Sequence, residues 1–213
     1  MQDETDKKWR RRSDARPGEL TAAAFALFAE QGFAATRLED VAARAGVSKA
    51  TIYRYFENKD ALFEAVIKDA IAPRFTEAET LVEAFQGTSA DLLRTFFKVA
   101  RGALGGPLPA LLKMIVSESG TFPQLARLWA DLGVSRMMGL MRRIVQRGID
   151  RGEFREVDLD VIAPLVAAPV FLLGIWKQTF AQTSLQLDPD RVLDQHIDLL
   201  LRGLSRNPKE QAP

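Results

Sequence analysis

Apolar and polar residues recur along this chain with the spacing of α-helices, and no segment is convincing as a strand. Pro17 suits the first position of a helix, and Gly32 suits the residue that ends one. Between them the apolar residues fall on one helical face: Leu20, Ala23, Ala24, Leu27 and Phe28. The pattern therefore predicts a first helix from Pro17 to about Gly32.

Two shorter helices joined by a tight turn are predicted next. Thr36 and Glu39 have the spacing of a capping box, which would open the second helix. That helix would stop at Gly46, because glycine tolerates a left-handed turn. Ser48 then suits the N-cap of a third helix that ends near Phe56. Three short helices with this turn outline a helix-turn-helix.

The rest of the sequence predicts longer helices separated by breaks that contain glycine or proline. Asn58 caps a fourth helix starting at Lys59, and Pro73 is expected to interrupt or kink it. The later helices are expected near residues 89–104, 108–118, 123–151, 158–181 and 189–204. The fold class is therefore all-α.

The helix expected at residues 158–181 is apolar on every side, and such a helix must be covered all round. One small domain supplies too little protein for that, so we expect a second copy of the chain to cover it. The alternative is ordinary core packing within one chain, with Pro164 and Pro169 bending the helix. The expected interface combines this helix with the last one: Leu165, Ala168, Leu172, Leu193, Ile197, Leu200 and Leu204.

The composition of the 213 residues excludes several classes of protein. There is no cysteine, which excludes disulfides and thiolate chemistry and fits a reducing cytoplasm. No run of 18 or more apolar residues predicts a membrane span, and the charged N-terminus does not resemble a secretory signal. His196 is the single histidine and is expected to be a packing or interface residue. No metal-ligand spacing and no glycine-rich phosphate loop is found, so we expect no metal, no cofactor and no enzyme.

The net charge is only +1, but cations cluster at residues 7–12, KKWRRR. Such a run is usually a solvated arm. It can also lie along DNA phosphates or in a minor groove, and both readings can hold for one arm.

The third predicted helix carries side chains suited to DNA. On a helical wheel Ile52 and Phe56 face the core. The outward or flanking residues offer cations, hydroxyls and a methyl group, which match phosphates, base edges and the thymine methyl. These residues are Lys49, Ala50, Thr51, Tyr53 and Arg54, with Tyr55 closer to the core edge. The alternative is a surface helix whose tyrosines only pack along its edge.

Residues 17–67 resemble the DNA-binding segment of the TetR family of bacterial transcriptional repressors, through the pattern G-V-S-x-x-T-I-Y-x-Y-F-x-N-K-x-x-L. The resemblance implies about nine helices, a homodimer, and release from a double-stranded DNA operator when a small ligand binds. Thr36, Arg37 and Lys59 would contact phosphate. The recognition helix would contribute Ser48, Lys49, Ala50, Thr51, Tyr53, Arg54 and Tyr55.

The later helices carry methionines and aromatic residues that fill irregular cores and also line ligand pockets. A pocket would use ten residues: Phe97, Arg101, Met114, Glu118, Phe122, Trp129, Met137, Met141, Phe171 and Trp176. Its walls predict a mainly apolar or aromatic effector. Arg101 would suit a carboxylate on that effector and Glu118 an amine. The alternative for most of these side chains is ordinary core.

The sequence thus predicts a cytoplasmic, ligand-responsive repressor with an arm at 1–16, a DNA-binding domain at 17–67, a ligand-binding and dimerisation domain at 68–206 and a tail at 207–213. The alternative function is an architectural or interaction protein that binds DNA without an effector.

Overall fold

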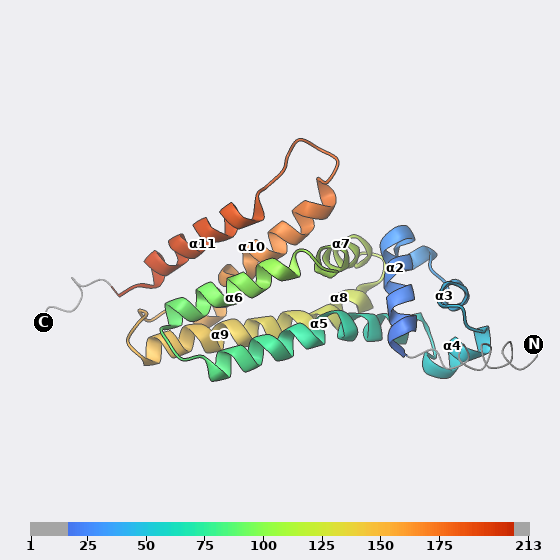
Figure 1. The fold of residues 1–213 in the computed structure, drawn as a ribbon, viewed down its shortest axis with the longest axis horizontal. Helices are drawn as coiled ribbons and strands as arrows, with labels where there is room; N and C mark the ends of the chain where they lie inside the picture. The colour runs from blue at the N-terminus through green and yellow to red at the C-terminus, as the bar shows by residue number, and fades with distance from the viewer. Residues whose placement is uncertain (1–16, 207–213) are drawn as a thin grey trace, which may run out of the picture. The chain divides into compact units, whose positions relative to one another are not determined.

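The computed structural model describes residues 17–206, whose regular secondary structure is helical apart from one isolated bridge between Phe154 and Ser205 (Figure 1). The α-helices are α2 (Pro17–Ala35), α3 (Leu38–Ala45), α4 (Lys49–Tyr55), α5 (Lys59–Ala84), α6 (Ser89–Ala103), α7 (Leu108–Glu118), α8 (Pro123–Trp129), α9 (Ser135–Asp150), α10 (Leu159–Thr179) and α11 (Pro189–Leu204). A π-helical turn, Ala130–Val134, joins α8 to α9 without a gap. With these three segments counted as one helix, the described residues hold nine helices, which confirms the all-α prediction.

The chain forms two compact units. The N-terminal unit consists of the described residues up to Ala72 together with Met114–Trp129, and the C-terminal unit consists of Pro73–Lys113 and the described residues from Ala130 on. The segment Met114–Trp129 returns to the first unit, although it lies within the predicted second domain, residues 68–206. Pro73 does not end α5 as a helix, although the boundary between the units falls just before it.

Aromatic residues form the centre of the N-terminal unit. The rings of Phe28, Phe33 and Phe63 contact one another with centroids 5.3 to 5.7 Å apart. Phe122, from the segment that returns to this unit, lies 5.1 Å from Phe33. The unit also buries aliphatic side chains: Leu20, Ala24, Val41, Ile52, Leu62, Ile67 and Leu125. This core fixes α2, α3, α4 and the first half of α5 as one support for the helix-turn-helix.

The C-terminal unit has a core of its own, contributed mainly by α6, α9, α10 and α11. Its fully buried members include Leu92, Leu93, Phe97, Leu140, Met141, Ile144, Val145, Ala163, Val166 and Leu193. The end of α9 passes so close to the following loop that a Cβ at Gly148 would lie 2.1 Å from the ring of Phe154. Glycine at this position therefore allows the loop to close over the core.

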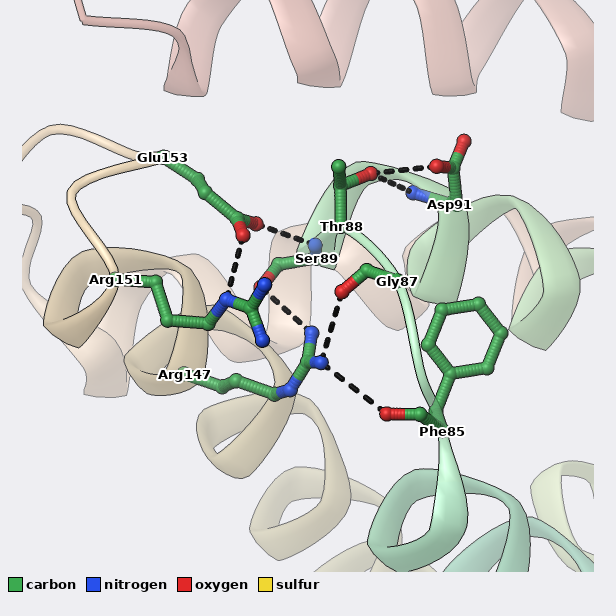
Figure 2. Close-up of polar contacts among 8 residues, drawn as sticks. All are labelled: Phe85, Gly87, Thr88, Ser89, Asp91, Arg147, Arg151 and Glu153. Carbon is green, nitrogen blue, oxygen red and sulfur yellow. Dashed lines mark hydrogen bonds and ion pairs between the residues drawn. The ribbon is translucent and has the colours of Figure 1, made fainter.

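Polar contacts fasten the loop between α5 and α6 to the end of α9 (Figure 2). The guanidinium of Arg147 donates to the carbonyl oxygens of Phe85 and Gly87, at 3.3 and 2.9 Å, and to the Ser89 hydroxyl at 3.0 Å. Glu153 accepts from the Ser89 backbone N–H and from Arg151. This network gives hydrogen-bond partners to the carbonyls of Phe85 and Gly87 where the chain leaves helical geometry.

Candidate nucleic-acid interface

The turn between α3 and α4 has the geometry that the sequence predicts. Gly46 is left-handed, with φ 70° and ψ 30°. Its N–H donates to the carbonyl of Ala43 at 3.1 Å, and the N–H of Val47 donates to that of Ala42 at 2.9 Å. These bonds satisfy carbonyls at the end of α3 and turn the chain toward α4.

Ser48 begins α4 as its N-cap, because its hydroxyl accepts the N–H of Thr51 at 3.1 Å. Ile52 is completely buried and Phe56 almost so, which anchors the helix on the core. Thr51 is half-buried, and its hydroxyl lies 2.8 Å from that of Ser48. One face of α4 therefore packs against the core, and the opposite face is exposed to solvent.

The solvent-facing residues of α4 form a continuous polar and aromatic surface: Ser48, Lys49, Ala50, Tyr53, Arg54 and Tyr55. The exposed fractions of Tyr53 and Tyr55 are 45% and 38%, large values for side chains of this size. Tyr55 is the less exposed of the two tyrosines, as expected for a residue closer to the core edge. Three hydroxyls and two cations lie beside one small methyl group on this surface, and these groups match phosphates, base edges and the thymine methyl.

Glu39 of α3 joins this surface, and the sequence interpretation assigned it only a capping role. Its carboxylate accepts from the Lys49 ammonium at 2.7 Å and from the Tyr53 hydroxyl at 3.1 Å. The hydrogen bond from Lys49 is the main reason that the pKa of Glu39 falls to about 2. A pair of opposite charges across the turn is the signal that could have identified this contact from the sequence.

Arg54 and Tyr55 form a second linked pair on the same helix. The Arg54 guanidinium donates to the Tyr55 hydroxyl at 3.2 Å and lies 5.0 Å from the centre of its ring. A cation over an aromatic face is attracted by the ring quadrupole. The pair holds a guanidinium at the outer edge of α4.

Thr36, a predicted phosphate contact, turns its side chain into the protein. Thr36 is buried, and its hydroxyl donates to the carbonyl of Gly32 at 2.8 Å. The N-cap of α3 is Arg37, one residue later than predicted, and the carboxylate of Asp40 accepts its N–H at 3.3 Å. Arg37 itself is exposed at the start of α3.

Lys59, another predicted phosphate contact, uses its ammonium for hydrogen bonds within the chain. Its ammonium donates to three carbonyl oxygens, those of Phe33 at 2.7 Å, Ala34 at 3.1 Å and Thr36 at 3.0 Å. It lies 4.4 Å from the centre of the Phe33 ring, and burial lowers its pKa. All three donors of the ammonium are thus used to satisfy the end of α2.

The predicted effector residues are divided between the two units. Met114, Glu118, Phe122 and Trp129 belong to the N-terminal unit. Phe122 is part of its aromatic core, and a Glu118 oxygen lies where a Cβ on Gly32 would be only 2.6 Å away. These two side chains therefore support the helix-turn-helix unit.

The other predicted effector residues lie in the C-terminal unit, in different surroundings. Phe97 and Met141 are fully buried in its core, and Met137 packs against that core. Phe171 is exposed on α10. Trp176 donates its indole N–H to the carbonyl of Leu185 at 2.7 Å, which fastens the loop after α10.

Arg101, the predicted partner of an effector carboxylate, already has two carboxylate partners. Its guanidinium forms ion pairs with Asp190 at 2.9 Å and Asp194 at 2.6 Å, both on α11. The sequence could not show this pairing because the residues are far apart along the chain.

A pocket of about 440 Å³ lies elsewhere, along α9 and the start of α10. Its lining is rich in charged residues: Arg142, Arg143, Gln146, Arg147, Asp150, Arg151 and Leu159. None of the predicted effector residues belongs to it.

Large apolar side chains are exposed on one face of α10. Val161, Leu165, Ala168 and Leu172 follow at intervals of four, three and four residues, and all are exposed. On α11 the exposed apolar residue is Leu199, with 62% of its surface accessible. Of the predicted interface residues on that helix, Leu193 and Leu204 are instead buried within the chain, and Ile197 and Leu200 pack against the same core. Leu193 and Leu204 therefore contribute to the core of their own chain.

His196, predicted to be a packing or interface residue, is neither fully buried nor fully exposed. It is partly buried, its ring is 5.6 Å from that of Phe97, and burial lowers its pKa. Among residues 17–206 no group of three or more His, Cys, Asp or Glu side chains could hold a metal ion. The basic segment 7–12 falls outside the described residues.

A short helix capped by serine, reached through a left-handed glycine turn and exposing cations and tyrosines, defines the class of helix-turn-helix DNA-binding proteins. Residues 20–66 match the family described as bacterial regulatory proteins, tetR family, and residues 86–186 match the tetracyclin repressor-like C-terminal domain. The chain belongs to the TetR family of transcriptional regulators. It is a DNA-binding transcription regulator of the cytoplasm and not an enzyme.

Relatives of known name are similar along most of their length. The chain is 27% identical over 166 residues to the helix-turn-helix regulator YdeS of Bacillus subtilis, covering 78% of this chain and 81% of YdeS. It is 21% identical over 215 residues to the transcriptional repressor KstR2 of Rhodococcus jostii, covering 95% of each. The structure of the regulator FadR of Bacillus subtilis in complex with stearoyl-CoA has a TM-score of 0.75 at 18% identity and covers 89% of this chain and 100% of that one.

The apolar helix α10 differs from what the sequence predicted about membranes. It is long and apolar enough to cross a bilayer, with a mean hydropathy of 2.1, and only a third of that stretch is buried within the chain. The core helix of a soluble protein passes the same test, so one such helix is weak evidence for a membrane span.

Proposed function

We propose that this protein is a ligand-responsive repressor that binds a roughly palindromic operator as a homodimer and is released by a mainly apolar effector. The observation that carries the proposal is the surface of α4, where Lys49, Tyr53, Arg54 and Tyr55 are exposed while Ile52 and Phe56 anchor the helix. The recognition helix of such a turn enters the major groove, and two copies read two half-sites about one helical turn or more apart.

The exposed face of α10 supports the homodimer. Val161, Leu165 and Leu172 are each about half exposed, which is costly for large apolar side chains in water. A second copy that meets this face about a two-fold axis would cover it with identical residues. Interfaces of this obligate kind bury on the order of 2,000 Å² or more in total.

The chemistry of similar proteins supports the apolar effector. A structural relative of this chain was solved with stearoyl-CoA, and another is called a ketosteroid regulator. Both ligand classes combine a large hydrocarbon part with a polar group. Effector binding must favour a spacing of the two recognition helices unlike the DNA-bound one, because a ligand shifts an equilibrium only through its differential affinity.

An effector-independent DNA-binding protein is the second candidate function. It is favoured by the position of the pocket on α9, which contains none of the predicted effector residues. The two candidate functions predict different results when a ligand is added: the repressor releases its DNA, and the effector-independent protein does not.

A two-stage experiment tests the proposal. Thermal unfolding of the full chain is first recorded with stearoyl-CoA, palmitate and a C19 steroid as probes, and a probe that binds raises the unfolding temperature. DNA selected by the wild-type protein from a random pool is then titrated with and without that probe. The repressor proposal expects at least a tenfold loss of DNA affinity. A probe that raises the unfolding temperature without changing DNA affinity would contradict it.

A further inference from the structure

Glu39 is the one acidic side chain that contacts the exposed face of α4 among the described residues. A single carboxylate oxygen accepts from Lys49 at 2.7 Å and from Tyr53 at 3.1 Å. Lys49 and Tyr53 are four residues apart, so they lie next to each other on the outward face. The carboxylate of α3 therefore bridges two of the groups with which α4 meets DNA.

This contact is formed in solvent and contributes little to holding the fold. The side chains of Lys49 and Glu39 are 67% and 40% exposed, and exposed ion pairs are weak. The turn and the core place α4 without it, through Gly46, Ser48 and Ile52. A role in binding thus explains the position of Glu39 better than a role in folding.

We propose that Glu39 is a specificity-determining residue: together with Lys49 it presents an acceptor beside a donor, a pattern that suits a G·C base pair and disfavours bare phosphate. This inference rests on the proposed DNA-binding function of α4. The edge of a G·C pair in the major groove offers the guanine N7 and O6 acceptors to Lys49 and the cytosine N4–H donor to Glu39. Phosphate offers only acceptors, so it attracts Lys49 and repels Glu39.

The charge of the Glu39 carboxylate is consistent with this role. Lys49 lowers the pKa of Glu39 to about 2, so Glu39 carries its charge throughout the physiological range. The same pairing raises the pKa of Lys49, which remains an ammonium. Both members of the pair keep the charges that the base-pair pattern requires.

The test compares Glu39→Gln with a matched control, Glu30→Gln. Glu30 pairs with Arg44 on the surface of the same unit, so both variants remove one negative charge and one exposed ion pair. Only Glu39 touches α4. Glu39→Asp, which keeps the charge, is the conservative variant. Each protein is titrated, over a range of salt concentrations, with a duplex selected by the wild-type chain from a random pool and with a scrambled duplex of equal length and composition.

For Glu39→Gln we expect the scrambled duplex to bind several-fold more tightly, because Lys49 becomes available to phosphate. The slope of log affinity against log salt should steepen by about one for one more neutralised phosphate. The ratio of selected to scrambled affinity should fall about tenfold or more, and replacement of one G·C pair by A·T in each half-site should cost less than it costs the wild type. Glu39→Asp should keep most of the wild-type ratio.

An unchanged ratio for Glu39→Gln, or an equal change for Glu30→Gln, would overturn the inference. A wild-type chain that enriches no sequence would instead overturn the proposed function, so the two failures are distinguishable. Circular dichroism of each variant identifies any loss of helix, and a folded Glu39→Gln with wild-type discrimination counts against the inference.

Discussion

The ammonium of Lys59 donates to three carbonyl oxygens at and just after the end of α2. Removing it leaves the carbonyls of Phe33, Ala34 and Thr36 without their partner. Its place against the Phe33 ring adds a cation–aromatic contact. A basic residue near a recognition helix can thus act on DNA binding through the fold alone.

Lys59→Ala should lower the free energy of unfolding by about 1–3 kcal/mol, the usual cost of orphaning partly buried acceptors of a charged donor. Urea denaturation measures it. Lys68→Ala is the control, since Lys68 is an exposed α5 cation paired only with Glu64 among the contacts described, and it should change stability by less than about 0.5 kcal/mol. A fully stable Lys59→Ala whose DNA binding has lost about one unit of salt slope would restore the phosphate role.

The carboxyl group of Glu39 gives a prediction about pH. Its pKa is depressed from an ordinary 4.5 to about 2 by Lys49. A depressed acid pKa stabilises the folded state above the unfolded value and loses that contribution as the pH falls. The Glu39–Lys49 contact should therefore persist at neutral pH and break between about pH 4.5 and 2. Carboxyl-carbon NMR should show a midpoint near 2, and Lys49→Ala should return it toward 4.5; a wild-type midpoint near 4.5 would mean that the contact is not formed in solution.

The side chains that face outward on α4 could be predicted from the sequence, because Ile52 and Phe56 fix the helical phase. The hydrogen-bond partners of Thr36 and Lys59 could not be predicted from the sequence. Both were assigned to phosphate by resemblance, yet both satisfy carbonyls around the end of α2. Short-range spacing does not reveal which backbone groups a fold leaves without partners.

At the scale of elements, the two glycines of α9 have opposite surroundings. A Cβ at Gly139 would have no neighbour within 4 Å, whereas one at Gly148 would collide with Phe154. Both lie inside one helix, so helix propensity acts on both in the same direction.

Gly139→Ala should raise the free energy of unfolding by about 0.5–1 kcal/mol, because alanine is the better helix former. Gly148→Ala should lower it by about 1–3 kcal/mol, the cost of overpacking at the Phe154 ring. Chemical denaturation of the two variants against the wild type gives the comparison. Equal effects would show that the loop after α9 does not close on this helix.

Helix starts and stops were largely predictable, since Ser48, Asn58 and Thr88 cap the helices that follow them. The face of α11 was not. Leucines lie on both sides of this helix: Leu193 and Leu204 are buried within the chain, and Leu199 is exposed. Residue type alone therefore does not show which side packs against the rest of the chain. Methionine and aromatic side chains carried the same ambiguity between core and pocket.

At the scale of the whole molecule, the main unexplained feature of one chain is the apolar face of α10 that is exposed to solvent. Within the C-terminal unit this helix is buried along Ala163, Val166 and Leu173 but open along Leu165 and Leu172. The open side is the proposed contact with a second copy.

Leu165→Glu should give a folded monomer, because a charge on the open face opposes association without entering the core. Leu204→Glu should instead prevent folding, since Leu204 is buried within the chain. Val116→Glu, at an exposed apolar residue on α7, is the control and should leave assembly unchanged. Sedimentation and circular dichroism separate the three results. A Leu165→Glu protein that sediments like the wild type would exclude this face from the interface.

The central claim is that two copies of α4 read two half-sites of DNA, and selection from a random duplex library by the full-length wild-type protein tests it most directly. The account predicts enrichment of an inverted repeat whose half-sites are about one helical turn or more apart. Lys49→Ala with Tyr53→Ala should abolish that enrichment, while Lys68→Ala should retain it. Recovery of the same inverted repeat by the double variant, or of a single unpaired half-site by the wild type, would contradict the account.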